Sequence, residues 1–234
     1  MIRAALLLAL LLPAAASAAD RTVGVGSFER LRVEGPFRVT VVAGPPRATV
    51  SGGRRAIDQV EVNANGGTLV VRMGANGWGE QPATGGGPVT VTLSTPALAS
   101  AWLTGGGDVS IARMKGQRVD VSATGAGRVA IASVDADQLT LTVIGSADIT
   151  ATGHAAKARL LTNGSGTIDA GGVAADELVV HLDGTGETKA QARFTAQVVS
   201  TGLGRVTVTG KARCNVQAVA GPVSCGPAVG GVAP

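Results

Sequence analysis

Few side chains in this sequence could act as catalytic groups, and those few are scattered. The best candidates for acid–base chemistry on a polysaccharide are four acidic residues: Asp148, Asp169, Asp183 and Glu187. Such sites need convergent carboxylates, often with calcium and a basic side chain. The chain has a repeat of 18 to 20 residues, and we expect each repeat to form one coil of a stack. In that stack Asp148 lies two coils from Glu187, and Asp169 occupies a different position within its coil. The sequence therefore favours a non-enzymatic protein, with a carbohydrate-active enzyme, a polysaccharide lyase or hydrolase, as the alternative.

Metal and cofactor motifs are weak. The two histidines are separate, with His154 in an expected turn and His181 at an outward strand position, so no zinc site is indicated. GAGRVA at residues 125–130 matches a dinucleotide fingerprint, but we expect a strand after it where the fingerprint needs a helix. No serine lies in a G-x-S-x-G elbow. We expect no catalytic residue, no metal ligand and no cofactor.

The two cysteines, Cys214 and Cys225, lie late in the chain. In a protein exported to an oxidising compartment we expect them to form a disulfide, and two buried free thiols are the alternative. In the chain-entropy model, a disulfide that closes so short a loop stabilises the folded protein by about 3 kcal/mol or less.

The amino end predicts that export. Arg3 is followed by an apolar run from Ala4 to Leu12 and by small residues up to Ala19, so residues 1–19 read as a signal peptide. The run is shorter than the roughly 20 residues of a membrane span, and no later stretch is apolar enough. We expect an exported mature chain, periplasmic or extracellular, with no membrane span.

The composition is unusual for a globular enzyme. There are five aromatic residues, no tyrosine and 35 glycines in 234 residues, while 45% of the chain is hydrophobic. Small aliphatic side chains and many glycines suit closely packed, repeated backbone. The net charge is only +4, and no basic cluster is interleaved with aromatics, so we expect no nucleic-acid partner.

Glycine-centred turns recur along the second half of the chain. The first glycines of successive turns are spaced by 18 to 20 residues, which predicts a β-solenoid whose coils bury their apolar faces against one another. The turn glycines are Gly105, Gly107, Gly125, Gly127, Gly145, Gly164, Gly166, Gly184, Gly186, Gly202, Gly204 and Gly221.

Apolar residues stand at fixed places around these turns. Four residues before the first glycine are Val121, Leu141, Leu160, Val180 and Val198, and they alternate with polar residues, as in a strand with one buried face. A second alternating strand follows each turn. The columns are rich in alanine and valine, so we expect a thin core.

A column of charged residues follows the turns: Asp108, Arg128, Asp148, Thr167, Glu187 and Arg205. In coils stacked about 4.8 Å apart, much of this column alternates in sign. We interpret it as a solvated charge ladder that fixes register, with a recognition ridge as the alternative.

Residues 28–73 read as antiparallel strands, with a turn at Gly35-Pro36 and a hairpin through Asn65-Gly66-Gly67. We expect Pro36 and Phe37 to cover the end of the core, and residues 74–88 to form a mobile loop. The expected organisation is a signal peptide (1–19), an N-terminal β cap with the first strands (20–104), the solenoid repeats (105–227) and a flexible tail (228–234).

Several segments together resemble one known family. They are FERLRVEGPFRVTVVAG, the GGTLVVRM hairpin, VTVTLSTPALASAWLTGGGDV and the recurrent G-x-G turns, over roughly residues 26–227. The family is that of the autotransporter adhesin head, GIN domain. The resemblance implies an all-β, right-handed parallel β-helix-like domain in the envelope or outside the cell, with adhesion as its suggested role and no established activity.

We therefore expect an exported envelope protein that acts as a structural or adhesin-like binding module. Its partner would be an envelope or surface ligand, a glycan or a protein, bound through outward strand faces rich in Thr, Ser, Asp and Arg. A purely architectural role is the third possibility.

Overall fold

The computed structural model describes residues 19–74 and 89–226. Residues 1–18, 75–88 and 227–234 lie outside the described residues. They include most of the expected signal peptide (1–19), most of the expected mobile loop (74–88) and the whole expected tail (228–234). The described chain is almost entirely β-strand, with one short helix.

In chain order the elements are β1 (Ala19–Val23), β2 (Arg30–Glu34), β3 (Arg38–Ala43), β4 (Arg47–Gly52), α1 (Arg54–Asp58), β5 (Val60–Asn65), β6 (Thr68–Met73), β7 (Thr90–Thr95), β8 (Ser100–Gly105), β9 (Asp108–Ile111), β10 (Met114–Gly125), β11 (Arg128–Gly145), β12 (Asp148–Gly164), β13 (Thr167–Gly184), β14 (Glu187–Ser200), β15 (Arg205–Gly210), β16 (Arg213–Ala218) and β17 (Val223–Cys225).

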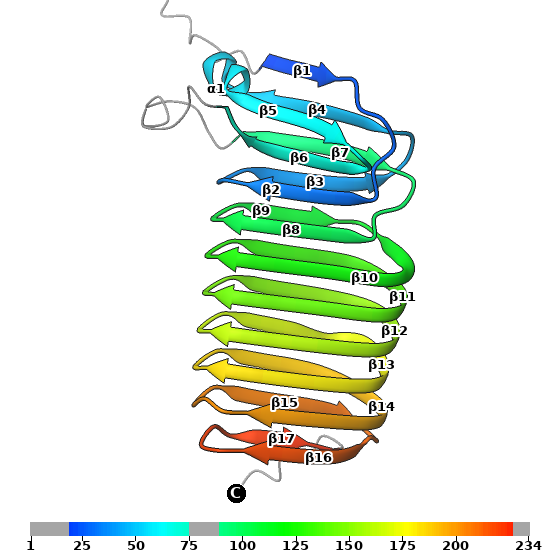
Figure 1. Ribbon diagram of the computed structural model, residues 1–234, viewed down its shortest axis with the longest axis vertical. Helices are drawn as coiled ribbons and strands as arrows, with labels where there is room; N and C mark the ends of the chain where they lie inside the picture. The colour runs from blue at the N-terminus through cyan, green and yellow to red at the C-terminus, as the bar shows by residue number, and fades with distance from the viewer. Residues whose placement is uncertain (1–18, 75–88, 227–234) are drawn as a thin grey trace, which may run out of the picture.

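Each repeat forms one coil, and the coils stack along the long axis of the molecule (Figure 1). One strand segment runs toward the glycine turn, a second runs back from it, and a bend leads into the next coil. Equivalent segments pair in parallel, as Leu139 does with Ala158 and Val129 with Ile149. We call the segments before the turns the first sheet and those after the turns the second sheet. The predicted all-β solenoid is confirmed.

The coil order in space differs from the order in sequence. β2 lies between β6 and β8 in the first sheet and pairs in parallel with both. β3 likewise lies between β7 and β9 in the second sheet. The expectation that residues 28–43 form an antiparallel pair is wrong: β2 and β3 form one coil around Gly35. Alternation reveals which face of a strand is buried, but not which strand is its partner.

Antiparallel strands cap the amino-terminal end, as expected. β5 pairs with β6 through the predicted hairpin, β4 pairs with β7, and β1 pairs with β4. The helix α1 packs on β1, β4 and β5 and buries Ile57 (Figure 1). Phe37 does not cover this end, because it lies buried within the β2–β3 coil. The terminal role that we expected of Phe37 thus belongs to α1 and the antiparallel strands.

The core lies between the two sheets and is built from columns of identical position. One first-sheet column is buried throughout: Val119, Leu139, Ala158, Leu178 and Ala196. A hydrogen bond of 2.9 Å between the hydroxyls of Thr162 and Thr188 satisfies two buried polar groups inside this core. Each coil lengthens the stack by about 4.8 Å, the spacing of neighbouring strands, and buries its apolar side against its neighbours.

The turns bring backbone into close contact with backbone. Gly164 has φ +119°, a conformation that side chains disfavour, and a Cβ there would lie 2.5 Å from the Gly145 carbonyl oxygen. That oxygen accepts hydrogen bonds of 2.9 Å from the amides of Ser165 and Gly166. The middle position of the turn is open, since a Cβ at Gly106 would have no atom within 4 Å. Glycine is therefore required at the first position of the turn, whereas the middle position accepts other residues.

The last turn departs from the predicted pattern. Five residues separate Ser200 from Val206, and four separate their register partners Ala218 and Val223. A Cβ on Gly221 would accordingly clash with the carbonyl oxygen of Gly204, so Gly221 falls in the column of the second glycines and not of the first. The final turn is shorter by one residue, which the glycine spacing alone does not reveal.

The disulfide closes the carboxy-terminal end of the core. Cys214 stacks on buried Ala196 of the first sheet, and Cys225 stacks on buried Val208 of the second sheet. The two sulfurs are bonded, with 6.2 Å between the Cα atoms. The predicted disulfide thus joins the two sheets in the last coil, where no further coil packs against it among the described residues.

Replacing Gly164 with alanine should destabilise the protein by about 2–4 kcal/mol, because alanine resists this φ and its methyl group meets the Gly145 carbonyl. Gly106→Ala is the matched control and should leave stability nearly unchanged. Denaturant unfolding followed by circular dichroism measures both. Equal midpoints for the two variants would contradict this account of the turns.

In the double variant Cys214→Ala/Cys225→Ala the free energy of unfolding should fall by about 3 kcal/mol or less, and the destabilisation should be confined to the last coils. Amide hydrogen exchange should speed up in β15, β16 and β17 and stay unchanged in β10, β11 and β12. Mass measurement before and after alkylation checks the bond itself, and two free thiols in protein from its native compartment would refute the pairing.

Candidate functional site

Outward side chains of the first sheet form rows that cross its strands. Along β2, β8 and β10 they alternate with buried residues, because successive residues of a strand face opposite sides. In register, one row contains Arg30, Ser100 and Asp120, and the next contains Arg32, Trp102 and Ser122. We call these six residues, together with Arg118, the Arg30–Trp102 face.

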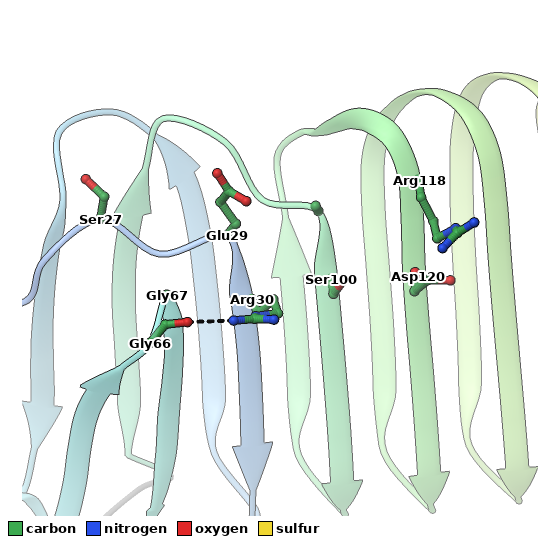
Figure 2. Close-up of a pocket in the computed structure, with 9 residues that line it drawn as sticks. Ser27, Glu29, Arg30, Gly66, Gly67, Ser100, Arg118 and Asp120 are labelled. Atoms are coloured by element: carbon green, nitrogen blue, oxygen red, sulfur yellow. Dashed lines mark hydrogen bonds between the residues drawn. The ribbon is translucent and has the colours of Figure 1, made fainter.

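A hollow of about 520 Å³ lies over the first of these rows (Figure 2). Short residues create it, because Ser100 stands between the longer Arg30 and Asp120, and Gly66 and Gly67 lie at its edge. The Arg30 guanidinium donates a hydrogen bond of 2.5 Å to the Gly66 carbonyl. The full lining is Ser27, Glu29, Arg30, Gly66, Gly67, Ala99, Ser100, Arg118 and Asp120.

A second hollow of about 420 Å³ surrounds Trp102. Trp102 is 36% exposed, because it faces outward between Ala101 and Leu103, which are buried. Small hydroxyl side chains and arginines surround it, and Arg30 also lines the first hollow. The lining is Arg30, Arg32, Thr68, Trp102, Leu103, Thr104, Ser122 and Thr124. The two hollows follow one another along β8 and share a guanidinium.

The charges of this face are only partly paired. Arg32 forms an ion pair of 2.8 Å with Glu34 on its own strand, and Arg118 donates to the Gln138 side chain at 3.4 Å. Asp120 makes no ion pair within 4 Å to any described residue. Its carboxylate, and the Arg30 N–H groups that are not bonded to Gly66, are therefore available to a ligand.

The residues of the expected charge ladder lie in one register row of the second sheet. Arg128 stands between Asp108 and Asp148 and approaches the Asp148 carboxylate at 3.9 Å. Thr167, Glu187 and Arg205 continue the row. Glu187 forms its ion pair with Lys189 of its own strand, at 3.5 Å, and not with Arg205. Exposed pairs of this kind stabilise little, so their part in fixing register stays a prediction.

Two further ion pairs join successive coils near the bends. Lys115 contacts Asp135 at 2.9 Å, and Lys157 contacts Glu177 at 3.1 Å, each between register partners. The hydrogen bond and positive charge of Lys115 lower the pKa of Asp135 below its ordinary value. These pairs belong to the stacking of coils and lie outside both hollows.

The four acidic residues considered for catalysis do not converge. Asp148 and Glu187 lie on the second sheet, separated by the coil that carries Thr167. Asp169 lies in another row, where its carboxylate accepts a hydrogen bond from a nearby backbone amide. Asp183 lies on the first sheet. No two of them are register partners, and none lines either hollow of the Arg30–Trp102 face.

Neither metal-binding clusters nor membrane-spanning helices occur in residues 19–74 and 89–226. No three His, Cys, Asp or Glu side chains gather there in a way that could hold an ion. His154 and His181 lie in β12 and β13, respectively. No helix in the described part of the chain has the length and apolar character needed to cross a bilayer.

Sequence reasoning missed Trp102 and Arg30 as a pair. The alternation around Gly105 already places Trp102 outward, since Ala101 and Leu103 occupy buried columns, so that signal was available. The position of Arg30 could not be found in the same way. It depends on the insertion of β2 between β6 and β8, which links residues about 70 positions apart in the chain.

Several solved structures have a similar fold. A putative adhesin from Bacteroides fragilis matches with a TM-score of 0.82 and 19% identity, covering 91% of this chain and 98% of its own. A putative adhesin from Parabacteroides distasonis matches with a TM-score of 0.70 and 15% identity, covering 90% and 97%. A putative lipid-binding protein from the same species matches with a TM-score of 0.67 and 15% identity, covering 89% and 94%.

No curated protein sequence matches the chain. The family model of the putative auto-transporter adhesin, head GIN domain, by contrast, matches residues 27–212. The matched range runs from just before β2 to the link between β15 and β16 and so includes all of the Arg30–Trp102 face. This protein belongs to the putative auto-transporter adhesin, head GIN domain family.

Proposed function

We propose that this protein is an exported, non-enzymatic binding module of the cell envelope, adhesin-like in its action, whose ligand lies on the Arg30–Trp102 face. The observation that carries the proposal is the pair of adjoining hollows in which one tryptophan and three arginines stand among short polar residues.

The backbone around this face favours recognition. β2, β8 and β10 are central strands, each paired on both sides, so the outward side chains stand at spacings set by the ladder. A site fixed in this way loses little freedom when a ligand binds. A mixture of guanidinium, carboxylate and hydroxyl groups beside an exposed indole suits a polar ligand that also has apolar surface.

The chemistry of the face supports binding more than turnover. Acid–base cleavage of a glycan needs two carboxyl groups on opposite sides of one bond. The four acidic residues considered for catalysis lie in separate rows or on the other sheet, and none of them joins Asp120 and Glu29 in the first hollow. The signal peptide and the disulfide between Cys214 and Cys225 are consistent with a location in the periplasm or outside the cell.

A plug of the first hollow tests the proposal. Ser100→Tyr adds a ring at an outward position. It should weaken retention of the protein on washed bacterial envelope fragments by about tenfold or more, because the added ring occupies the space that the ligand needs. Thr140→Tyr is the matched control, since Thr140 lies in the same row but lines neither hollow. The control should bind like the wild type in a co-sedimentation assay.

Equal retention of Ser100→Tyr and wild type, or no retention of the wild type, would contradict the proposal. The enzyme alternative is checked on the same material by assaying release of reducing sugar. If the wild type cleaves the polysaccharide, and Asp148→Ala and Glu187→Ala lose this activity while circular dichroism shows an intact fold, the enzyme alternative is supported and the binding proposal is contradicted.

A further inference from the structure

The chemistry of the Arg30–Trp102 face also indicates the class of its ligand. Resting on the proposed function, we infer that this face binds an acidic polysaccharide, with one sugar ring against Trp102 and a sugar carboxylate on Arg30. The site requires three things of its ligand: an apolar flat surface, hydroxyl groups and spaced negative charge.

Trp102 supplies the apolar platform. It stands in register between Arg32 and Ser122, and it is an exposed residue that lines the second hollow. A pyranose ring has one face of C–H groups, which packs on an indole, while its hydroxyls point outward around the rim. Thr104, Ser122 and Thr124 line the same hollow, and their hydroxyls can both donate to and accept from such sugar hydroxyls.

Arg30 supplies the charge selection. Its side chain lines both hollows, so a carboxylate in either can reach it. One terminal nitrogen donates to the Gly66 carbonyl, which fixes the guanidinium and leaves other N–H groups to bind a carboxylate as a fork. Arg118 lines the opposite side of the first hollow. A neutral sugar has no carboxylate that could accept hydrogen bonds from either guanidinium as a fork.

Acidic groups on the same face limit the density of negative charge that a bound ligand can have. Asp120 stands two strands from Arg30, with Ser100 between them, and Glu29 also lines the first hollow. These carboxylates accept hydrogen bonds from sugar hydroxyls but repel a densely charged chain. The face therefore fits a polyuronate with one carboxylate per ring better than a heavily sulfated polymer.

The arrangement of the hollows gives the ligand a direction. They succeed one another along β8, from Ser100 in the first hollow to Trp102 and Thr104 in the second. Their volumes of about 520 and 420 Å³ each accept a sugar ring with its hydration. An oligosaccharide would thus lie along β8, with neighbouring rings in neighbouring hollows.

The test uses the mature chain with Trp78→Phe, so that Trp102 is the remaining tryptophan and reports ring contact by its fluorescence. Oligogalacturonate is titrated against a neutral gluco-oligosaccharide and a sulfated oligosaccharide of equal length. We expect the uronate to change the fluorescence and to bind at least about tenfold more tightly than either, with affinity falling as salt rises.

Variants assign the roles. Trp102→Ala and Arg30→Gln should each weaken uronate binding, measured by calorimetry, by about tenfold. Arg159→Gln is the control, because Arg159 is an exposed arginine in the same outward row of the first sheet and lines neither hollow. It should bind the uronate like the wild type, and circular dichroism confirms that all variants fold.

Equal binding of neutral and acidic oligosaccharides, tighter binding of the sulfated one, or equal losses in Arg30→Gln and Arg159→Gln would overturn the inference. If no oligosaccharide binds while envelope retention still depends on Ser100, the inference fails and the proposed function stands. If envelope retention is absent as well, both fail.

Discussion

Close approach of one backbone to the next at the glycine turns is the constraint on which the rest of this structure depends. At Gly164 the chain takes a left-handed φ while the Gly145 carbonyl lies where a side chain would begin. This contact repeats in coil after coil and locks them in one register. The glycine-rich, aromatic-poor composition is a direct consequence, because repeated tight turns and a thin core leave little room for large side chains.

Register at the turns also determines the outer surface. Residues at the same position in successive coils stack on one another, so each outward position forms a row across the sheet. A residue of a different type within such a row changes the surface locally. Trp102 is such a residue, with Arg32 on one side and Ser122 on the other. The hollow beside it arises because Ser100 and the hairpin glycines are short, while Arg30 and Asp120 are long.

The two ends of the stack are closed by different means. At the amino-terminal end α1 and the antiparallel strands β1, β4 and β5 cover the core, which protects the apolar columns and the strand edges. At the other end the Cys214–Cys225 bond joins the two sheets where the columns stop. Between these ends each coil depends on its neighbours, as in other solenoids.

Much of this architecture could be predicted from the sequence, because the spacing of Gly105, Gly125 and their equivalents directly records the coil length. The buried columns followed from the same alignment, and the disulfide was predicted from the two cysteines of a chain expected to be exported. The insertion of β2 between β6 and β8 could not be predicted, since strand pairing across so many residues leaves no local pattern. The Arg30–Trp102 face was missed for that reason, because Arg30 and Trp102 come together only through this insertion.

The most direct test of the central claim, that the Arg30–Trp102 face holds an acidic glycan, is an NMR titration of the isotope-labelled mature chain with oligogalacturonate. We expect amide shifts to change along β2, β8 and β10, with the largest changes from Ser100 to Thr104 and at the Trp102 indole N–H. Shifts confined to the second sheet or to the carboxy-terminal coils, or no shifts at saturating ligand, would contradict the account.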